Sequence, residues 1–345
     1  AGAVRGVLRA QVMELLALLG KAYHCLCQYQ CEMALSLLDL LPAAQFRTPW
    51  VQQQVGRCHF ELGRNEEAQA ALEEMARLQP QRLEGLEVLS TVLWHLKKEA
   101  DLCYLTQRVL EIDRGSPYTW CVVGNCFSLQ KQPETAIKFF KRAIQVCPWF
   151  YYAHTLCGHE YVANEDFDRA MACYRDALRL DKRHYNAWYG LGTIYQRQEK
   201  YELAEYHFRR ALAIHPSSSV LRCYLGMVVG AAGRFADALQ ALNDASALNP
   251  NNPQARFQRA SMLLRMGQHQ EALEELEAVR NHAPREASVY FLIGKILQQL
   301  GRKDEALHNF TIALDLNPKD NNMIKVMIDK LETSVSEDNE EGKRF

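Results

Sequence analysis

Three cysteines and a histidine near the start of the chain are the residues most suited to binding a metal ion. His24, Cys25, Cys27 and Cys31 offer nitrogen and thiolate ligands. A structural zinc site, however, usually takes two closely spaced ligand pairs, and Cys-x-Cys-x-x-x-Cys is followed here by no second pair at zinc spacing. We therefore expect buried thiols that fill space, and we predict no metal site.

Acid–base and phosphate chemistry can be weighed in the same way. His95 and the neighbours His159 and Glu160 are candidate general bases, but no nucleophile stands at a fixed spacing from them. Gly190-x-Gly192 resembles part of a phosphate-binding loop, yet it lies inside a helical pattern instead of between a strand and a helix. The sequence therefore predicts no catalytic residues, no cofactor and no enzyme.

The composition of the chain limits its partners. Its 345 residues are 48% hydrophobic and 23% charged, which is typical of a soluble folded protein. The net charge of −1 leaves no basic surface for nucleic acid or an anionic membrane, and Glu14 and Lys21 interrupt the most apolar window. Eleven cysteines without a secretory signal favour a reducing compartment. Because the sequence starts at Ala1 instead of methionine, we expect a piece of a longer chain.

One short stretch, HYNAWYGLGTIY (residues 184–195), reveals how the chain is organised. With the residues that follow it, this stretch fills eight positions of a 34-residue unit that starts at Tyr185. Positions 4, 7, 8, 11, 20, 24, 27 and 32 are Trp188, Leu191, Gly192, Tyr195, Ala204, Phe208, Ala211 and Pro216. Together they form the complete pattern of the tetratricopeptide repeat, which is a pair of antiparallel helices.

The same pattern recurs along the chain at the same period. Six repeats keep strict phase, two weaker ones precede them, and a first one fits if two residues are inserted at its turn, with Leu19, Gly20 and Tyr23 in its first helix. The predicted repeats are 13–48, 49–82, 83–116, 117–150, 151–184, 185–218, 219–252, 253–286 and 287–320. Residues 1–12 are predicted to be a lead-in at the end of a linker, 321–332 a capping helix, and 333–345 an acidic disordered tail.

The pattern therefore predicts an all-α fold. We expect about nine helix pairs in a right-handed α-solenoid, a tetratricopeptide repeat superhelix, closed by the capping helix. Small residues at positions 8, 20 and 27 let the two helices of a repeat approach closely, while large residues fill the space between neighbouring pairs. Proline at position 32 ends the second helix of a repeat.

The concave groove of such a solenoid is the predicted functional surface. Positions 2, 5, 9, 12 and 13 of each first helix point into it, and in the central repeats they combine acids, amides and aromatic rings that suit an extended peptide. The alternative to a binding role is that Glu84 and Glu87 are ordinary solvent-exposed acids. The candidate peptide-binding residues are Glu84, Glu87, Thr91, Trp94, Asn125, Leu129, Tyr152, His159, Asn186 and Tyr189.

Several segments of the chain resemble one family more closely than the general repeat. They are similar to the third subunit of the anaphase-promoting complex, over about residues 20–320. These segments are LEGLEVLSTVLWHL (83–96), GNCFSLQ (124–130), AIKFFKRAIQV (136–146), GHEYV (158–162), RHYNAWYGLGTIY (183–195) and SSVLRCYLG (218–226).

The resemblance implies a non-catalytic scaffold subunit of a cell-cycle ubiquitin ligase in the nucleus and cytoplasm. Its groove would receive the C-terminal Ile-Arg tails of coactivators and of the small processivity subunit, and its other partners would be further subunits of the complex. Glu84 or Glu87 would read the tail arginine, Trp94 and Leu129 would enclose the isoleucine, and Asn125 would orient the tail backbone. The N-terminal repeats that dimerise family members are absent here, so a homodimer is expected only for the full-length chain.

Two other functions remain open at this stage. A structural sister subunit of the same complex shares similar segments, and a generic peptide-binding adaptor would have the same fold. A chaperone-binding array is disfavoured, because its carboxylate clamp needs Lys, Arg and Asn at groove positions where this chain has Tyr152, Thr155 and His159.

Overall fold

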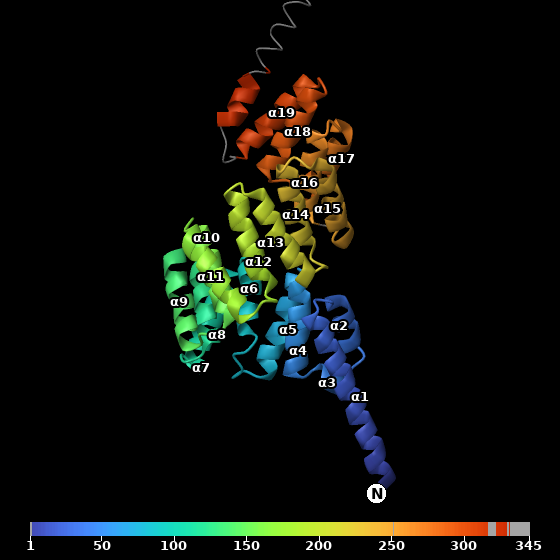
Figure 1. Ribbon diagram of the computed structural model, residues 1–345, viewed down its shortest axis with the longest axis vertical. Coiled ribbons are helices and arrows are strands. Elements are labelled where there is room, and N and C mark those ends of the chain that lie inside the picture. The colour runs from blue at the N-terminus through green and yellow to red at the C-terminus, as the bar shows by residue number, and fades with distance from the viewer. Residues whose placement is uncertain (1, 251, 317–321, 330, 332–345) are drawn as a thin grey trace, which may run out of the picture. The chain divides into compact units, whose positions relative to one another are not determined.

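The computed structural model consists of α-helices joined by short turns (Figure 1). It describes residues 2–250, 252–316, 322–329 and 331, and no helix within these ranges is long and apolar enough to cross a membrane. The chain divides into two compact units, an N-terminal unit of Ala1–Ser218 and a C-terminal unit of Ser219–Phe345.

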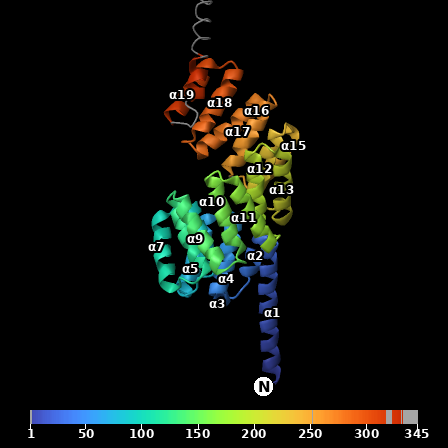
Figure 2. The same ribbon diagram turned by 60° about the vertical axis from the view of Figure 1, so that its left-hand side comes forward.

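In the N-terminal unit, helices pack as consecutive antiparallel pairs, and Figure 2 shows α9, α10 and α11 side by side. We refer to the two helices of each repeat as its A and B helices. The helices are α1 (Gly2–Cys27), α2 (Cys31–Leu38), α3 (Ala43–Phe46), α4 (Pro49–Glu61), α5 (Asn65–Leu78), α6 (Leu86–His95), α7 (Glu99–Ile112), α8 (Pro117–Leu129), α9 (Pro133–Val146), α10 (Tyr151–Ala163), α11 (Phe167–Leu180), α12 (Tyr185–Arg197) and α13 (Tyr201–Ile214).

The C-terminal unit continues the same pairing. Its helices are α14 (Ser219–Ala231), α15 (Phe235–Leu248), α16 (Pro253–Arg265), α17 (His269–His282), α18 (Ala287–Gln299) and α19 (Lys303–Asp315). A further helical segment covers residues 322–329, within the predicted capping helix, and its Ile324 is buried against the core of α16–α19. Pro318 and the predicted tail 333–345 lie outside the described residues.

The contact that holds each pair together joins position 8 of the A helix to position 24 of the B helix. A Cβ atom added to Gly192 would lie 2.8 Å from the ring of Phe208, and one added to Gly294 would lie 2.7 Å from the ring of Phe310. Both phenylalanines are fully buried. Because glycine has no side chain, the phenylalanine ring fills the space beside it. The backbone of the A helix can therefore approach the B helix closely.

Large residues at position 24 also join neighbouring repeats. The ring of Tyr174 in α11 packs against Gly158 of its own repeat and against Gly190 of α12 in the next one. The expected division between small residues within a pair and large residues between pairs is thus incomplete, because one buried ring serves both contacts.

The turns between A and B helices repeat as regularly as the helices do. Each contains one residue in the left-handed region, and successive ones are 34 positions apart, at Tyr29, Gly63, Lys97, Lys131, Glu165, Glu199, Gly233, Gly267 and Gly301. At Glu199 the N–H donates to the carbonyl of Gln196 at 3.0 Å, and the N–H of Lys200 donates to that of Tyr195 at 2.9 Å. This pair of bonds is the Schellman motif, which satisfies carbonyls at the end of the A helix.

The first repeat corrects the register expected from sequence. Tyr29 lies one full period before Gly63, so no residues are inserted at its turn. Ala22, which is 2% exposed, lies one period before Gly56 at position 8, whereas a Cβ added to Gly20 would meet nothing within 4 Å. The expectation failed because glycine at residue 20 was read as the small residue of the helix crossing, a role that alanine fills here.

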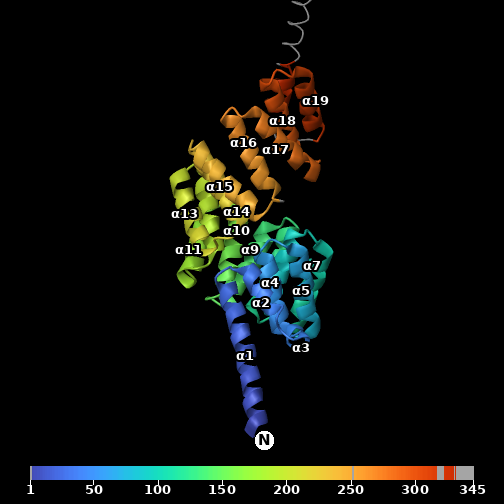
Figure 3. The same ribbon diagram turned by 90° about the vertical axis from the view of Figure 1, so that its right-hand side faces the viewer.

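The N-terminal residues also differ from the expected linker. Helix α1 begins at Gly2 and is continuous through residues 1–12 of the predicted lead-in, apart from Ala1. The segment has no proline, and its three alanines and two arginines favour a helix, whereas its two glycines and three valines disfavour one. Its first half extends away from α2 and α4, as Figure 3 shows, and Met13 and Leu16 are exposed.

The N-terminal unit closes on itself through contacts between its first two repeats and its last two. The Tyr29 ring stacks on His215, with ring centroids 4.6 Å apart, and the Ser217 hydroxyl donates to the Tyr29 carbonyl at 3.1 Å. The guanidinium of Arg183 donates to the carbonyl of Cys27 at 2.9 Å, and the hydroxyl of Tyr185 donates to Glu61 at 2.7 Å. We call this set of residues the closure contact.

We predict that Gly192→Leu destabilises the protein by about 1–3 kcal/mol, because the added side chain must displace the buried ring of Phe208. The thermal midpoint followed by far-UV circular dichroism measures this change. Gly20→Ala is the matched control, since its site is open, and its midpoint should stay the same or rise. An unchanged midpoint for the leucine variant would refute the packing described above.

We also predict that Glu199→Gly stabilises the protein by about 1 kcal/mol, because glycine adopts the left-handed conformation of that residue without a Cβ clash. The control is Glu202→Gly, the same substitution in the first turn of α13, which should destabilise by up to about 1 kcal/mol. Chemical denaturation gives both values. Equal signs for the two variants would contradict the assigned role of the turn.

Candidate functional site

The candidate site is the face of the N-terminal unit formed by A helices α6, α8 and α10. Position 9 of two of these helices carries Thr91 and Asn125, and position 2 of α10 carries Tyr152. Asn125 is 4% exposed and donates through Nδ2 to the Ser90 hydroxyl at 2.8 Å and to the Thr91 hydroxyl at 3.0 Å. The Thr91 and Tyr152 hydroxyls are 2.6 Å apart. Ser90, Thr91, Asn125 and Tyr152 form what we call the polar network.

The polar network changes the role expected for Asn125. The sequence suggested that Asn125 holds a peptide amide through both its donor and its acceptor. Its donor is already engaged with Ser90 and Thr91, so Oδ1 is the atom left to meet a ligand. Hydrogen bonds inside the protein thus fix the orientation of this side chain before any ligand arrives.

A second chain of hydrogen bonds runs across the same three helices. The Trp94 indole N–H donates to the Ser128 hydroxyl at 3.0 Å, and that hydroxyl donates to Glu160 at 2.6 Å. Burial raises the pKa of the Glu160 carboxyl, and its bond with Ser128 opposes this. Trp94 keeps 38% of its surface exposed, which leaves one side of its ring free for an apolar ligand group.

The two candidate acids, Glu84 and Glu87, lie in different environments. Glu84 is exposed and forms an ion pair with Arg82, with Oε2 and Nη2 2.9 Å apart. It therefore fits the alternative of an ordinary solvent-exposed acid. Glu87 is 9% exposed and its Oε2 accepts the Gly85 N–H at 2.7 Å. Burial raises the pKa of Glu87 to about 7, although two backbone hydrogen bonds and the charge of Arg57 lower it.

No cation within the described ranges lies within 4 Å of the Glu87 carboxylate. Its charge nevertheless reaches the aromatic residues of the same face, because after burial it is the next cause that raises the pKa of Tyr118. Glu87 is therefore a buried acid that solvent and neighbouring cations compensate only in part, and a cationic ligand would favour its ionised form.

The remaining predicted residues lie on α8, α10 and α12. Leu129 is partly buried against the core of α5–α8. His159 is bonded through Nδ1 to the Tyr174 hydroxyl at 2.8 Å, and burial lowers its pKa to about 4, so the ring is neutral at physiological pH. Asn186 and Tyr189 of α12 are half-buried, and the Tyr189 ring lies 6.0 Å from Phe208. The structure thus brings together the residues of α6, α8 and α10, with α12 beyond them.

Sequence reasoning missed two charged residues on α4. Arg57 and Glu61 stand at positions 9 and 13 of their repeat, so the positional rule used for later repeats would have found them. The charge of Arg57 lowers the pKa of Glu87 and of Glu61, while burial raises both. Arg57 has no carboxylate of a described residue within 4 Å. Helix α4 therefore supplies a cation that is not tied into an ion pair and lies close enough to Glu87 for its charge to act on that carboxyl.

Seven of the eleven cysteines are buried, but Cys27, for which we expected a buried thiol, is exposed. Cys25, Cys31 and Cys58 are buried together in one small apolar cluster, and all eleven thiols are free. Across the described ranges, no group of three or more His, Cys, Asp or Glu side chains is placed to hold a metal ion.

Comparisons with known proteins agree with the helix pairing. Family models described as tetratricopeptide repeat match residues 51–82, 158–219, 230–296 and 287–320. In the solved structure of the APC/C hetero-tetramer of Cut9 and Hcn1, one chain matches with a TM-score of 0.77, at 15% identity, over 87% of this chain and 58% of that one. At this identity the likeness shows the fold.

Sequence relatives are closer. The chain is 46% identical over 214 residues to protein bimA of Emericella nidulans, covering 62% of this chain and 27% of bimA. It is 45% identical over 234 residues to cell division cycle protein 27 homolog B of Arabidopsis thaliana, covering 68% and 31%. It is 42% identical over 228 residues to anaphase-promoting complex subunit 3 of Schizosaccharomyces pombe, covering 66% and 34%.

The chain spans about a third of the length of these curated relatives, between 27% and 34%. The shared segment is nevertheless long, because each match takes in several consecutive repeats. Together with the helix pairs and the repeat matches, it shows that the chain is a tetratricopeptide repeat protein related to the third subunit of the anaphase-promoting complex.

Proposed function

We propose that this chain is part of a non-catalytic scaffold subunit of an anaphase-promoting complex, and that the face of α6, α8 and α10 binds C-terminal Ile-Arg tails. The tails would belong to coactivators and to the small processivity subunit. The scaffold part of the proposal rests on sequence relatives that include anaphase-promoting complex subunit 3 of Schizosaccharomyces pombe. By this proposal the protein acts in the nucleus and cytoplasm beside other subunits, and it forms a homodimer only as the full-length chain.

The single observation that carries the tail-binding proposal is the environment of Glu87. Glu87 is 9% exposed, and no described cation lies within 4 Å of its carboxylate. A guanidinium from a tail arginine would supply the missing charge through a charge-assisted hydrogen bond. Desolvated acids of this kind are expensive without a partner, which favours a ligand of opposite charge over a neutral one.

Arg57 supports a C-terminal rather than an internal arginine. A residue at the end of a chain carries a free carboxylate as well as its side chain, so a terminal arginine presents both signs of charge within a few ångströms. The charge of Arg57 lowers the pKa of Glu87, and the two residues offer the complementary pair of charges. We assign the tail guanidinium to Glu87 and the terminal carboxylate to Arg57.

The neighbouring residues supply the remaining roles. The exposed part of Trp94, together with Leu129, would enclose the isoleucine. Asn125 Oδ1 would accept a backbone N–H of the tail, and Glu84 would add long-range attraction from the rim. Tyr152 and His159 both form hydrogen bonds with protein side chains, so we assign them a structural role in which they position the neighbouring residues of the face.

We predict saturable binding of a labelled peptide that ends in Ile-Arg with a free carboxylate, followed by fluorescence anisotropy. Asn125→Ala and the double variant Glu84→Ala with Glu87→Ala should each weaken binding tenfold or more, as expected for loss of a charge-assisted or buried hydrogen bond of about 1.5–3 kcal/mol. Lys138→Ala is the control, since Lys138 is exposed on B helix α9.

The peptide with an amidated C-terminus separates the two charges of the tail. It should bind the unaltered protein less tightly than the free acid, and Arg57→Ala should remove this difference while lowering the affinity for the free acid. Absence of binding by protein that is folded by circular dichroism would sink the tail-binding proposal. It would leave the alternative of a sister scaffold subunit that acts through its contacts with neighbouring subunits.

We further predict that tail binding tightens about tenfold between pH 6 and pH 8, because a group with pKa near 7 is about 9% ionised at the lower pH and about 91% at the higher. The sign follows from the carboxylate being the form that pairs with a guanidinium. His159, with a pKa of about 4, stays neutral across this window. Glu87→Gln should abolish the rise, and a rise that persists in this variant would assign the proton to another group.

A further inference from the structure

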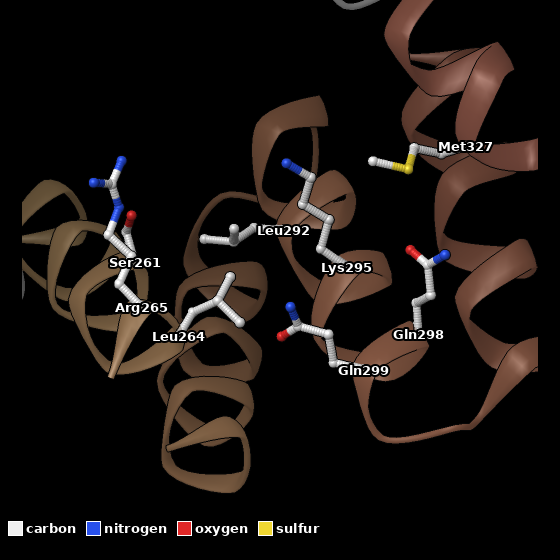
Figure 4. A pocket seen from close by; sticks show the side chains of 8 residues that line it. All are labelled: Ser261, Leu264, Arg265, Leu292, Lys295, Gln298, Gln299 and Met327. Atoms are coloured by element: carbon white, nitrogen blue, oxygen red, sulfur yellow. The ribbon is translucent and has the colours of Figure 1, made fainter. Parts of the chain in front are cut away.

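The C-terminal unit contains a pocket that the proposed function does not use. It has a volume of about 410 Å³ and lies between α16, α18 and the helical segment 322–329 (Figure 4). Most of its lining residues stand at positions 9, 12 and 13 of their A helices, the positions that also form the candidate site in the N-terminal unit. The pocket is therefore a second concave site on the same type of helix face.

Two cations define the charge of this pocket. The Arg265 guanidinium carbon lies 5.9 Å from the ring centroid of Phe235, and the Lys295 ammonium lies 4.7 Å from that of Phe291. Neither has a carboxylate of a described residue within 4 Å, and the lining contains no Asp or Glu. Aromatic rings thus hold both cations in place while leaving their charge unpaired.

Apolar and amide groups complete the pocket. Figure 4 shows the Leu264 and Leu292 side chains pointing toward one another between α16 and α18, with Met327 on the far side of α18. Gln298 and Gln299 add amides that can bond a peptide backbone. A small hydrated ion would gain no binding free energy from the apolar surface of Leu264 and Leu292. An apolar peptide side chain would gain it, because it would be removed from water there.

We propose that this pocket binds an extended acidic peptide segment of a partner protein, in which two carboxylate side chains flank an apolar residue. Arg265 and Lys295 pair with the carboxylates, and the apolar residue packs on Leu264 and Leu292. The charge preference is opposite to that of Glu87 in the N-terminal unit, so the two sites select different ligands. A scaffold with both sites holds two partner segments at once.

A capped, labelled peptide, acetyl-Gly-Ser-Glu-Leu-Glu-Ser-Gly-amide, tests the proposal when it is titrated with the full chain. We expect saturable binding that weakens with added salt, and no binding of the matched peptide with Gln-Leu-Gln. Arg265→Gln and Lys295→Gln should each weaken binding about fivefold, the upper range for an exposed ion pair. Arg285→Gln removes an equal charge from an exposed residue outside the pocket and should change nothing.

Two outcomes would overturn the proposal. One is equal binding of the Gln-Leu-Gln peptide, or binding of the acidic peptide that survives the double variant Arg265→Gln with Lys295→Gln. The other is loss of Ile-Arg tail binding in that double variant without any binding of the acidic peptide, because the pocket would then belong to the tail site. Retained tail binding in the double variant shows that the protein is folded, and it keeps the two sites separate.

Discussion

The close approach of the two helices in a repeat, where a large residue at position 24 packs over a small residue at position 8, is the constraint on which the rest of the structure depends. Where Phe208 packs on Gly192, no side chain separates the A helix from its partner, so the crossing of the pair is fixed by backbone and ring. A glycine at position 8 meets Phe140, Tyr174 or Phe310 in three other repeats and Leu72 or Leu242 in two more. Because every A helix is set in the same way, positions 2, 5 and 9 of consecutive A helices come to the same face.

The fold could therefore be predicted from sequence almost entirely. The same pattern of small and large residues recurs in several repeats, so one clear repeat identifies the others. The single error in register concerned the first repeat. Gly20 was expected at position 8, where the two helices cross, but Ala22 fills that position. The face of the candidate site followed from position alone. The hydrogen bonds on it did not, because the donor of Asn125 turns toward Ser90 and Thr91, and no spacing rule specifies that choice.

Electrostatic environment was the least predictable property. Glu84 and Glu87 are three residues apart and of one type, yet the first is paired on the surface and the second is buried with its pKa raised to about 7. The difference arises because Gly85, in the left-handed region, starts α6 so that the Glu87 carboxyl turns back onto the Gly85 N–H. Arg57 stands at position 9 of repeat 49–82, which precedes the first repeat for which groove residues were predicted.

The closure contact sets a limit on how this chain can evolve. Repeat proteins commonly gain or lose whole repeats, because each one touches mainly its neighbours. Here Tyr29, in the turn of the first repeat, meets His215, at the end of the sixth. Duplicating or deleting a repeat between them would replace these partners with residues 34 positions away. The number of repeats before residue 218 is thus fixed by a contact between the first and the last of them.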